Sequence, residues 1–284
     1  MATVRASDGI ALHYDVLGRA HREPLLMIQG LGADMSGWAF QRLAFAGSFR
    51  TIAMDNRGAG RSDKPRGVYS LDQMADDAIA VLDAAGVERA HVMGASMGGA
   101  IAQILAVRRP ERVSSLVLAC TACRHHPWRR ELLERWAVVA EEQGMRQLAS
   151  EAIRFLVEPR SFRRFGPALG LMGPLALAAP GYAFAAQARA ILATDDDLRL
   201  ALPSIKVPTL VVVGNQDILT PRGDSEELAE LIPGAELVVI AGAAHGLMVE
   251  HASTFNRVVL DFLRRASCGG TDLGHAPPAP SVVV

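Results

Sequence analysis

The hydrophobic residues of the chain form short, nearly unbroken runs separated by polar segments that contain glycine. Four runs, at residues 24–30, 50–58, 90–96 and 112–120, are apolar on both faces, which is typical of strands covered on both sides in a parallel sheet. Residues 3–18 contain the turn pair Asp8-Gly9 and predict two further strands. Later runs at residues 207–217 and 235–240 bring the expected number of strands to eight.

Helical patterns lie between these runs. Ser70 and Gln73 form a capping-box pattern at the start of a helical period of apolar residues. A second helix is expected from Met97 until Pro110 stops it. Apolar residues at helical spacing over residues 249–263 predict a final amphipathic helix. This alternation of strands and helices indicates an α/β protein.

The pattern changes between residues 121 and 203, where helical patches alternate with glycine and proline and no strand-like run appears. We therefore predict an α/β fold with a doubly wound, mostly parallel eight-stranded sheet flanked by helices, and a helical cap inserted after strand six. The expected units are a first core part (1–121), the cap or lid (122–203), a second core part (204–266) and a flexible C-terminal tail (267–284).

Composition and charge narrow the class of partner. The 29 Lys and Arg residues nearly balance 30 Asp and Glu residues, and the formal net charge of −1 offers no electrostatic footprint for nucleic acid or an anionic membrane. Residues 165–186 are apolar but contain three prolines, so we expect bent, pocket-lining helical structure and no stable membrane insertion. A small-molecule partner is expected, and a homo-oligomer is compatible with the sequence.

The ends and the cysteines indicate a compartment. Residues 1–9 have neither the basic nor the apolar region of an export signal. The three cysteines cannot all pair with one another and are expected to be reduced thiols. We therefore expect a cytoplasmic protein.

One serine stands among small residues in the stretch 91–105. The motif Gly94-Ala95-Ser96-Met97-Gly98 follows a predicted strand and opens a predicted helix, the context of a Gly-x-Ser-x-Gly nucleophile elbow. The elbow strains the serine backbone, aims its hydroxyl outward and points the Met97 amide toward developing negative charge. The same glycines would also allow a helix to pack closely against a strand, and the motif alone does not distinguish this structural role from a nucleophile elbow.

A serine nucleophile needs a base and an acid that orients the base. His245 lies in a small-residue loop between the last strand and the last helix, and Asp217 stands just beyond the run that precedes them. All three residues follow predicted strands, and open α/β sheets build their sites at the carboxyl ends of strands. We therefore predict a catalytic triad of Ser96, Asp217 and His245.

Five motifs in this order make the sequence resemble the α/β-hydrolase fold superfamily over residues 4–265, apart from much of the insertion. They lie at residues 29–38, 55–63, 94–98, 214–221 and 243–246. The resemblance implies a second oxyanion-hole amide from Leu31, beside that of Met97, with Gly30 and Gly32 supporting the loop. Many relatives have His-Gly where this chain has Gln29-Gly30, so the bonds that brace the loop are expected to differ.

The resulting hypothesis is a serine hydrolase that cleaves a small, largely apolar ester or lactone through an acyl-enzyme, without metal or organic cofactor. Gly30, Trp38, Trp128 and Leu247 are the expected substrate-pocket residues. The alternatives are a carbon–carbon bond hydrolase or a cofactor-free perhydrolase or haloperoxidase. A receptor-like binding protein and a non-hydrolytic lyase or cyclase are alternatives of other classes.

Other polar residues have structural interpretations. Asp55, Arg57 and Ser62 are expected to form a polar loop braced by local hydrogen bonds and a pair between the aspartate and the arginine. Cys120 and Cys123 form a C-x-x-C without a second ligand pair at zinc spacing, so Cys120 is interpreted as core at the end of a strand.

Overall fold

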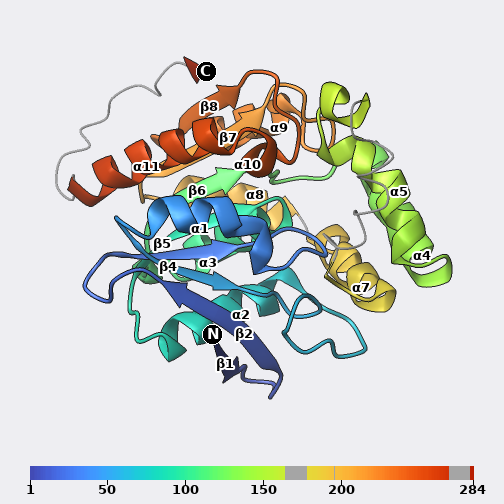
Figure 1. Cartoon of the computed structure of the whole chain (residues 1–284), viewed down its shortest axis with the longest axis horizontal. Helices are drawn as coiled ribbons and strands as arrows, with labels where there is room; N and C mark the ends of the chain where they lie inside the picture. Colours follow the sequence, from blue (N-terminus) through green and yellow to red (C-terminus); the bar gives the residue numbers. More distant parts are fainter. Residues whose placement is uncertain (164–177, 195, 269–281) are drawn as a thin grey trace.

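The computed structural model describes residues 1–163, 178–194, 196–268 and 282–284. One twisted sheet runs through the molecule, with helices on both of its faces (Figure 1). Its nine strands among the described residues are β1 (Ala2–Arg5), β2 (Ala11–Leu17), β3 (Pro24–Ile28), β4 (Arg50–Met54), β5 (Ala90–Ala95), β6 (Val113–Ala119), β7 (Thr209–Gly214), β8 (Glu236–Ile240) and β9 (Val282–Val283).

The sheet order is β1-β2-β4-β3-β5-β6-β7-β8-β9. Strand β2 is antiparallel to β1 and to β4, and the other neighbouring strands run parallel. The predicted doubly wound, mostly parallel sheet is therefore confirmed. Because β3 to β8 are parallel, the loops after them gather along a single edge of the sheet.

Helices cover each face of the sheet because successive strand residues point to opposite sides. Leu26 and Ile28 of β3 join a core cluster with α2 (Leu71–Ala84) and α3 (Met97–Arg108). Leu25 and Met27 join a second cluster with α1 (Ala39–Phe45), α10 (Leu247–Glu250) and α11 (Ala252–Cys268). The expected capping box is partly present, since the Ser70 hydroxyl accepts a hydrogen bond from the Gln73 amide at 3.1 Å.

The long connection between β6 and β7 carries four described α-helices. They are α4 (Pro127–Glu142), α5 (Met145–Leu156), α7 (Gly181–Leu192) and α8 (Asp196–Ala201). Helices α4, α5 and α7 lie together beside the sheet (Figure 1), whereas α8 contacts α3 of the core. Of the stretch 165–186, for which bent helical structure is predicted, residues 165–177 lie outside the described residues.

The last residues of the chain differ from the expected tail. Helix α11 extends to Cys268, two residues beyond the predicted core boundary. Val282 and Val283 then form β9, which pairs in parallel with Val238 and Val239 of β8. An open edge strand exposes unpaired backbone groups, and β-branched valines suit an added strand. Residues 282–284 of the predicted tail are therefore hydrogen-bonded at the sheet edge, and β9 is one strand more than the eight predicted.

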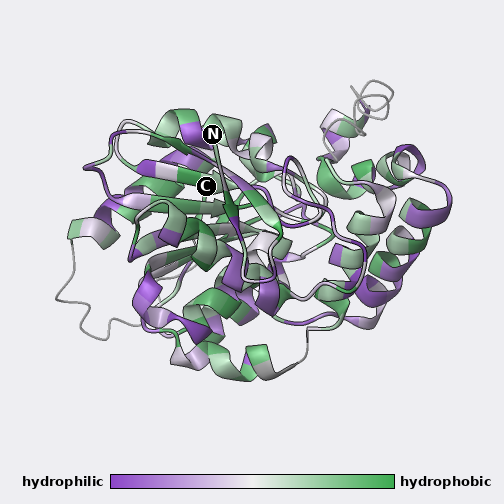
Figure 2. Cartoon of the chain, turned by 90° about the horizontal axis from the view of Figure 1, so that it is seen from below, coloured by the Kyte–Doolittle hydropathy of each residue, from purple (hydrophilic) through white to green (hydrophobic). Residues whose placement is uncertain are grey.

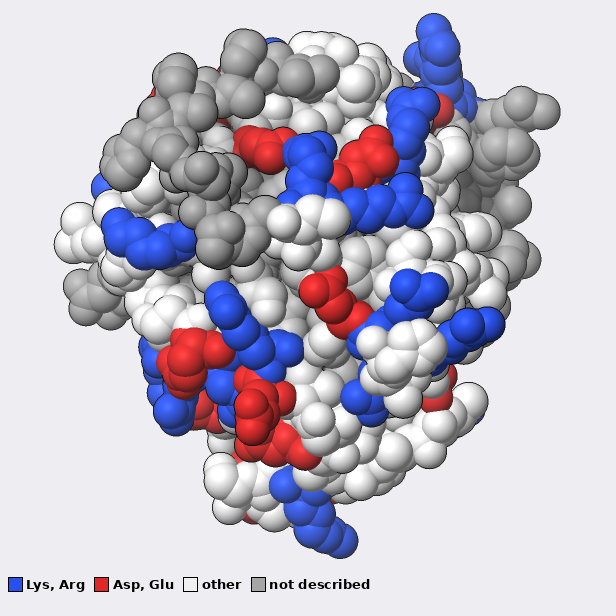
Figure 3. Space-filling model, turned by 90° about the vertical axis from the view of Figure 1, so that its left-hand side faces the viewer, with Lys and Arg blue, Asp and Glu red and all other residues white. Residues whose placement is uncertain are grey.

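The surface carries both signs of charge. On the face in Figure 3, Lys and Arg side chains lie interspersed with Asp and Glu. Hydrophilic and hydrophobic residues alternate around the outer helices in Figure 2, which fits helices with one buried face. Among the helices that the structure describes, none is long and apolar enough to cross a membrane.

Candidate active site

Ser96 sits on a strained turn between β5 and α3. Its φ of 53° and ψ of −118° lie in a region that non-glycine residues rarely adopt. A Cβ at Gly94 would overlap the carbonyl oxygen of Gly98, and a Cβ at Gly98 would overlap that of Ile28. Ser96 is partly exposed between two buried neighbours, so the turn presents its hydroxyl at the edge of the sheet. This backbone is that of the predicted elbow.

The glycine after the elbow has a different role. A Cβ at Gly99 would lie 2.6 Å from the Cβ of Thr121, so this glycine lets α3 pack closely on the end of β6. Both interpretations of the glycine-rich stretch therefore apply, to different residues. Gly94 and Gly98 make the turn, and Gly99 makes the join.

Asp217 and His245 form a buried pair. The Nδ1 of His245 lies 2.8 Å from the Oδ2 of Asp217, and the two residues are only 7% and 4% exposed. The Oδ1 of Asp217 accepts backbone hydrogen bonds from Leu219 and Thr220, both at 2.9 Å. The Thr220 hydroxyl donates to Oδ2 at 2.8 Å. The carboxylate can only accept, so His245 carries its proton on Nδ1 and leaves Nε2 as a base.

The environment keeps Asp217 charged. Burial acts to raise the pKa of its carboxyl group, but the neighbouring His245 and the hydrogen bonds from Thr220 together hold that pKa below its ordinary value. An anion beside Nδ1 fixes the imidazole tautomer and stabilises an imidazolium. The pair therefore has the electrostatics of a base with its orienting acid.

The end of β6 joins the loop of His245 to the elbow of Ser96. The Cys120 thiol donates to the carbonyl oxygen of His245 at 3.2 Å, and the Thr121 hydroxyl donates to that of Ser96 at 2.8 Å. Cys120 and Thr121, which are consecutive, thus hold the loop of His245 and the elbow of Ser96 next to the end of β6. Cys120 is fully buried, and burial, followed by the charge of Asp217, raises the pKa of its thiol well above the ordinary range. The thiol stays neutral and is a donor, not a nucleophile.

The loop after β3 approaches the elbow from the other side. A Cβ at Gly30 would lie 3.1 Å from the Cβ of Ser96 and 3.7 Å from its hydroxyl oxygen, so the backbone of the loop passes beside the serine. The Gly30 amide donates to the Oε1 of Gln29 at 3.0 Å, and the Gly32 amide to the Oε1 of Gln187 at 2.8 Å. The Leu31 amide between them has no acceptor among the described residues.

The Met97 amide is the second free donor. Met97 is the first residue of α3, so the helix itself offers its amide no acceptor, and the described residues supply none. These two amides, one on the loop after β3 and one at the start of α3, have no acceptor in the described part of the chain and lie beside a partly exposed serine, an arrangement that can hold an oxyanion.

Gln29 braces the loop after β3. Its side chain packs against Gly37, at which any Cβ would overlap it, and its carbonyl oxygen accepts a hydrogen bond from the Nδ2 of Asn56 at 2.9 Å. The bond from the Gly30 amide uses the glutamine side chain, whereas the bond from Asn56 is made to the backbone carbonyl oxygen of Gln29. Because Gln29 occupies the amide of Gly30, that amide is unavailable to a substrate.

The expected pocket residues occupy different environments. Trp38 and Leu247 are fully buried in the core cluster beside α1 and α11. Trp128 is 41% exposed at the start of α4, with the guanidinium of Arg129 5.2 Å from its ring centre. These placements give the two buried residues a packing role, and their contact with substrate stays a prediction. Gly30 alone among the four is placed beside Ser96.

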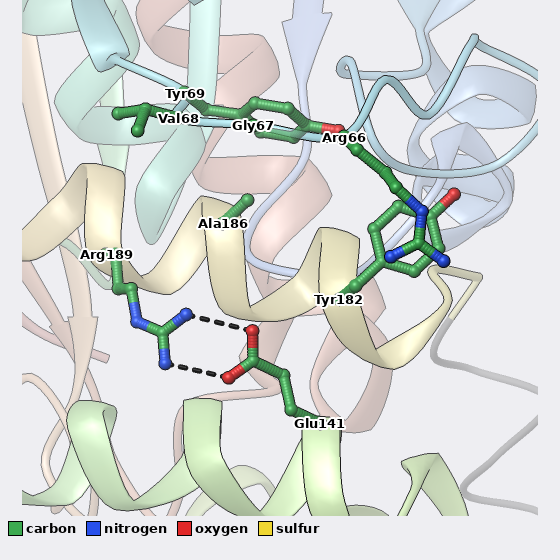
Figure 4. Close-up of a pocket in the computed structure, with 8 residues that line it drawn as sticks. All are labelled: Arg66, Gly67, Val68, Tyr69, Glu141, Tyr182, Ala186 and Arg189. Carbon is green, nitrogen blue, oxygen red and sulfur yellow. Dashed lines mark hydrogen bonds and ion pairs between the residues drawn. The ribbon is translucent and has the colours of Figure 1, made fainter.

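A pocket of about 250 Å³ lies between the cap helices and the core. Residues 66–69 form one wall, and α4 and α7 form the other, where Arg189 and Glu141 make a two-bond ion pair (Figure 4). The Arg66 guanidinium lies 4.5 Å from the ring centre of Tyr182. The walls of this pocket include none of the predicted catalytic residues.

The polar loop after β4 is structural, but one expected contact is wrong. Asp55 accepts hydrogen bonds from the amides of Met35 and Arg61, each at 2.8 Å, and does not pair with Arg57. Arg57 instead binds Asp77, because the buried guanidinium needs a carboxylate on the neighbouring α2. The loop is braced as predicted, through other partners.

Sequence reasoning missed Thr220 and Gln187. Thr220 follows the motif that supplies Asp217, and its hydroxyl position depends on the turn. Gln187 lies in the cap and carries no motif. Only the folded chain brings it to the loop after β3.

The fold, the elbow and the paired acid and base define an α/β hydrolase. Residues 34–252 match the family described as "Serine aminopeptidase, S33", and the chain belongs to this family. It is an enzyme of the α/β-hydrolase class.

The curated relatives carry several names. The chain is 34% identical over 269 residues to "3-oxoadipate enol-lactonase 2" of Acinetobacter baylyi, covering 93% of this chain and 96% of that protein. It is 32% identical over 270 residues to "Putative carbamate hydrolase RutD" of Caulobacter segnis, covering 93% and 100%. It is 35% identical over 258 residues to "2-hydroxymuconate semialdehyde hydrolase" of a Pseudomonas species, covering 86% and 87%.

Solved structures agree in fold. The crystal structure of the enol-lactonase from Burkholderia xenovorans LB400 matches with a TM-score of 0.85 and 31% identity, covering 93% of this chain and 100% of that chain.

Proposed function

We propose that this enzyme is a serine hydrolase that cleaves a small, largely apolar carboxylic ester or lactone through an acyl-enzyme. The observation that carries the proposal is the buried pair of Asp217 and His245 at the sheet edge that also holds Ser96 on its strained turn. Similarity to proteins named as enol-lactonases supports the lactone arm of the proposal.

The chemistry follows from the arrangement of donors and acceptors. Nε2 of His245 takes the proton of the Ser96 hydroxyl while the oxygen attacks the substrate carbonyl carbon. The carbonyl oxygen becomes negative and accepts hydrogen bonds from the free amides of Leu31 and Met97. The imidazolium then gives its proton to the leaving alkoxide, and water releases the acyl group by the same steps. In a lactone the leaving alkoxide stays attached to the acyl group.

The cap is proposed to enclose the substrate. The described helices α4, α5 and α7 of this segment lie beside the sheet, and an apolar cover would exclude water and favour largely apolar substrates.

A carbon–carbon bond hydrolase is the second candidate. It is favoured by the 35% identity to a protein named 2-hydroxymuconate semialdehyde hydrolase. Such a reaction needs the leaving group to depart as a carbanion that takes up a proton, so its substrate is a vinylogous diketone: the serine attacks one carbonyl, and the second, conjugated carbonyl stabilises the carbanion.

A three-arm activity screen tests the proposal. Wild-type protein and Ser96→Ala are assayed on p-nitrophenyl esters of increasing acyl length, on lactones of increasing ring size, and on a vinylogous 1,5-diketone. Turnover of esters or lactones that Ser96→Ala loses supports the proposal. Turnover of the diketone alone supports the second candidate, and no Ser96-dependent turnover in any arm contradicts both.

A further inference from the structure

Gln187 is a cap residue with both ends of its side chain bonded to the core. It lies on α7 and is fully buried. Its Oε1 accepts the Gly32 amide at 2.8 Å, and its Nε2 donates to the carbonyl oxygen of Arg57 at 2.7 Å. The side chain therefore bridges the loop after β3 and the loop after β4, from a helix that belongs to neither.

A backbone bridge runs parallel to it. The Ala178 amide donates to the carbonyl oxygen of Gly32 at 2.8 Å, and the carbonyl oxygen of Ala178 accepts the Gly60 amide at 2.9 Å. Gly32 thus has both its N–H and its C=O bonded to the cap segment. The same segment also holds the loop after β4 at Arg57 and Gly60, so the two loops are tied to each other through the cap.

The core is shaped to receive this side chain. Gly58 has a φ of +88°, and a Cβ there would lie 2.8 Å from the ring of Tyr69 and 3.3 Å from the Nε2 of Gln187. Glycine is thus required both by the backbone conformation and by the space beside the glutamine. The site that Gln187 occupies therefore depends on a glycine of the core as well as on the cap helix.

These bonds flank the free amide of Leu31. On one side, the carbonyl oxygen of Gly30 accepts the amide of Ala33 at 3.3 Å, a long and weak bond. On the other side, Gly32 has a φ of +71° and is held at both polar atoms by the cap. The Gly30 amide is also held, by the Oε1 of Gln29 at 3.0 Å, so the Leu31 N–H lies between a brace from Gln29 and a brace from the cap at Gly32.

We propose that Gln187 is a positioning residue for the oxyanion hole: docked between Gly32 and Arg57, it holds the Leu31 amide in the direction that a developing oxyanion requires. The inference rests on the proposed serine hydrolysis. It makes the cap a part of the catalytic machinery, because a cap displaced from the core withdraws the brace from the oxyanion loop.

Gln187→Met is the direct test, since methionine keeps the length and the unbranched shape of glutamine and removes both hydrogen bonds. The expected result on a p-nitrophenyl ester is a fall in kcat of about 10- to 100-fold with little change in KM, less than the 10²- to 10³-fold loss expected when an oxyanion donor is removed outright. Affinity for a trifluoromethyl ketone, which forms an oxyanion on the serine, should fall by a similar factor.

Two variants serve as controls. Gln41→Met also removes two hydrogen bonds of a buried glutamine, to the carbonyl oxygen of Met248 and to the Oδ1 of Asn256, but touches neither Gly32 nor Arg57, and it should keep kcat within about threefold. Gln187→Glu should recover much of the lost kcat, because burial raises the pKa of the new carboxyl group and a protonated acid can accept from Gly32 and donate to Arg57.

The outcomes separate the two claims. If wild type turns over the ester and Gln187→Met keeps both its kcat and its affinity for the ketone, the positioning role is overturned while the proposed function stands. If Gln187→Met loses activity only in proportion to a loss of folded protein, as judged by thermal unfolding, the role is also overturned. If wild type shows no Ser96-dependent activity, the proposed function fails and this inference fails with it.

Discussion

The replacement Asp217→Asn perturbs the proposed site at its most constrained atoms. The Oδ1 of Asp217 accepts two backbone amides, from Leu219 and Thr220, whereas Oδ2 faces His245 and the Thr220 hydroxyl. An asparagine must keep its carbonyl oxygen at the position of Oδ1, because its NH₂ group cannot accept from two N–H donors. Its NH₂ group then points at Nδ1 of His245.

The tautomer of the base is reversed in consequence. The NH₂ group donates to Nδ1, so the imidazole proton moves to Nε2, which can no longer accept the proton of Ser96. Rotating the amide to restore the original tautomer leaves two buried amides without acceptors, at about 1–3 kcal/mol each, so the competent form is a small fraction. We expect a loss of about 10⁴-fold in the rate of attack, or about 5 kcal/mol of barrier.

The assay is the second-order rate of Ser96 labelling by a fluorophosphonate, which needs no knowledge of the natural substrate. Asp55→Asn is a control for the loss of a buried carboxylate away from His245: Asp55 accepts one backbone amide on each of its two oxygens, from Met35 and Arg61, so the asparagine gives up one of these bonds but leaves the base untouched. Its labelling rate should stay within about tenfold of wild type. A folded Asp217→Asn protein that also labels within tenfold of wild type would refute the tautomer argument.

Three further predictions concern packing, thiols and pH. Gly98→Ala forces a methyl group onto backbone and should lower the unfolding free energy by at least about 2 kcal/mol in urea titrations, more than Gly99→Ala, which meets a threonine side chain. A disulfide reagent should titrate one thiol, the exposed Cys268, in the native protein and three after denaturation. Burial and neighbouring arginines lower the pKa of His125 to about 4. In the unfolded chain this imidazole takes up a proton as the pH falls through about 6.5, whereas in the folded chain it stays neutral until the pH is much lower. This imidazole alone should lower the free energy of unfolding by about 2 kcal/mol between pH 7 and pH 5, and His125→Asn should remove that contribution from the pH slope.

The outcomes that would contradict these three predictions are equally specific. A loss of unfolding free energy in Gly98→Ala below about 2 kcal/mol, or no larger than that in Gly99→Ala, would contradict the backbone overlap at the elbow. Rapid reaction of two or three native thiols would mean that the cysteines at the end of β6 are accessible. An unchanged pH slope in His125→Asn would mean that this imidazole titrates normally.

The sequence predicts the parts of this molecule that local chemistry determines. Unbroken apolar runs predict the central strands because both faces of such strands are covered. The elbow is predicted because only glycine fits at Gly94 and Gly98, and both glycines stand in the Gly-x-Ser-x-Gly motif of the sequence. The order of Ser96, Asp217 and His245 adds the candidate triad, since parallel strands bring their carboxyl ends together.

Contacts that depend on the packing of distant segments escape the same reasoning. Gln187 meets Gly32 across 155 positions of sequence, and glutamine on a helix has no pattern that indicates a buried bridge. The sequence predicts Trp38 at the substrate pocket but does not reveal that its ring is buried in the core cluster that contains Phe45 of α1. The pairing of Val282 with β8 likewise depends on an open sheet edge that composition does not reveal.

The most direct test of the central claim is to identify the residue that a fluorophosphonate modifies in the native protein. Wild-type protein is labelled, digested and mapped by mass spectrometry, with Ser96→Ala and heat-denatured protein as controls. The account predicts a single phosphonylated site at Ser96 and no labelling in Ser96→Ala or after denaturation. Labelling at another residue, or none in folded wild-type protein, would contradict it.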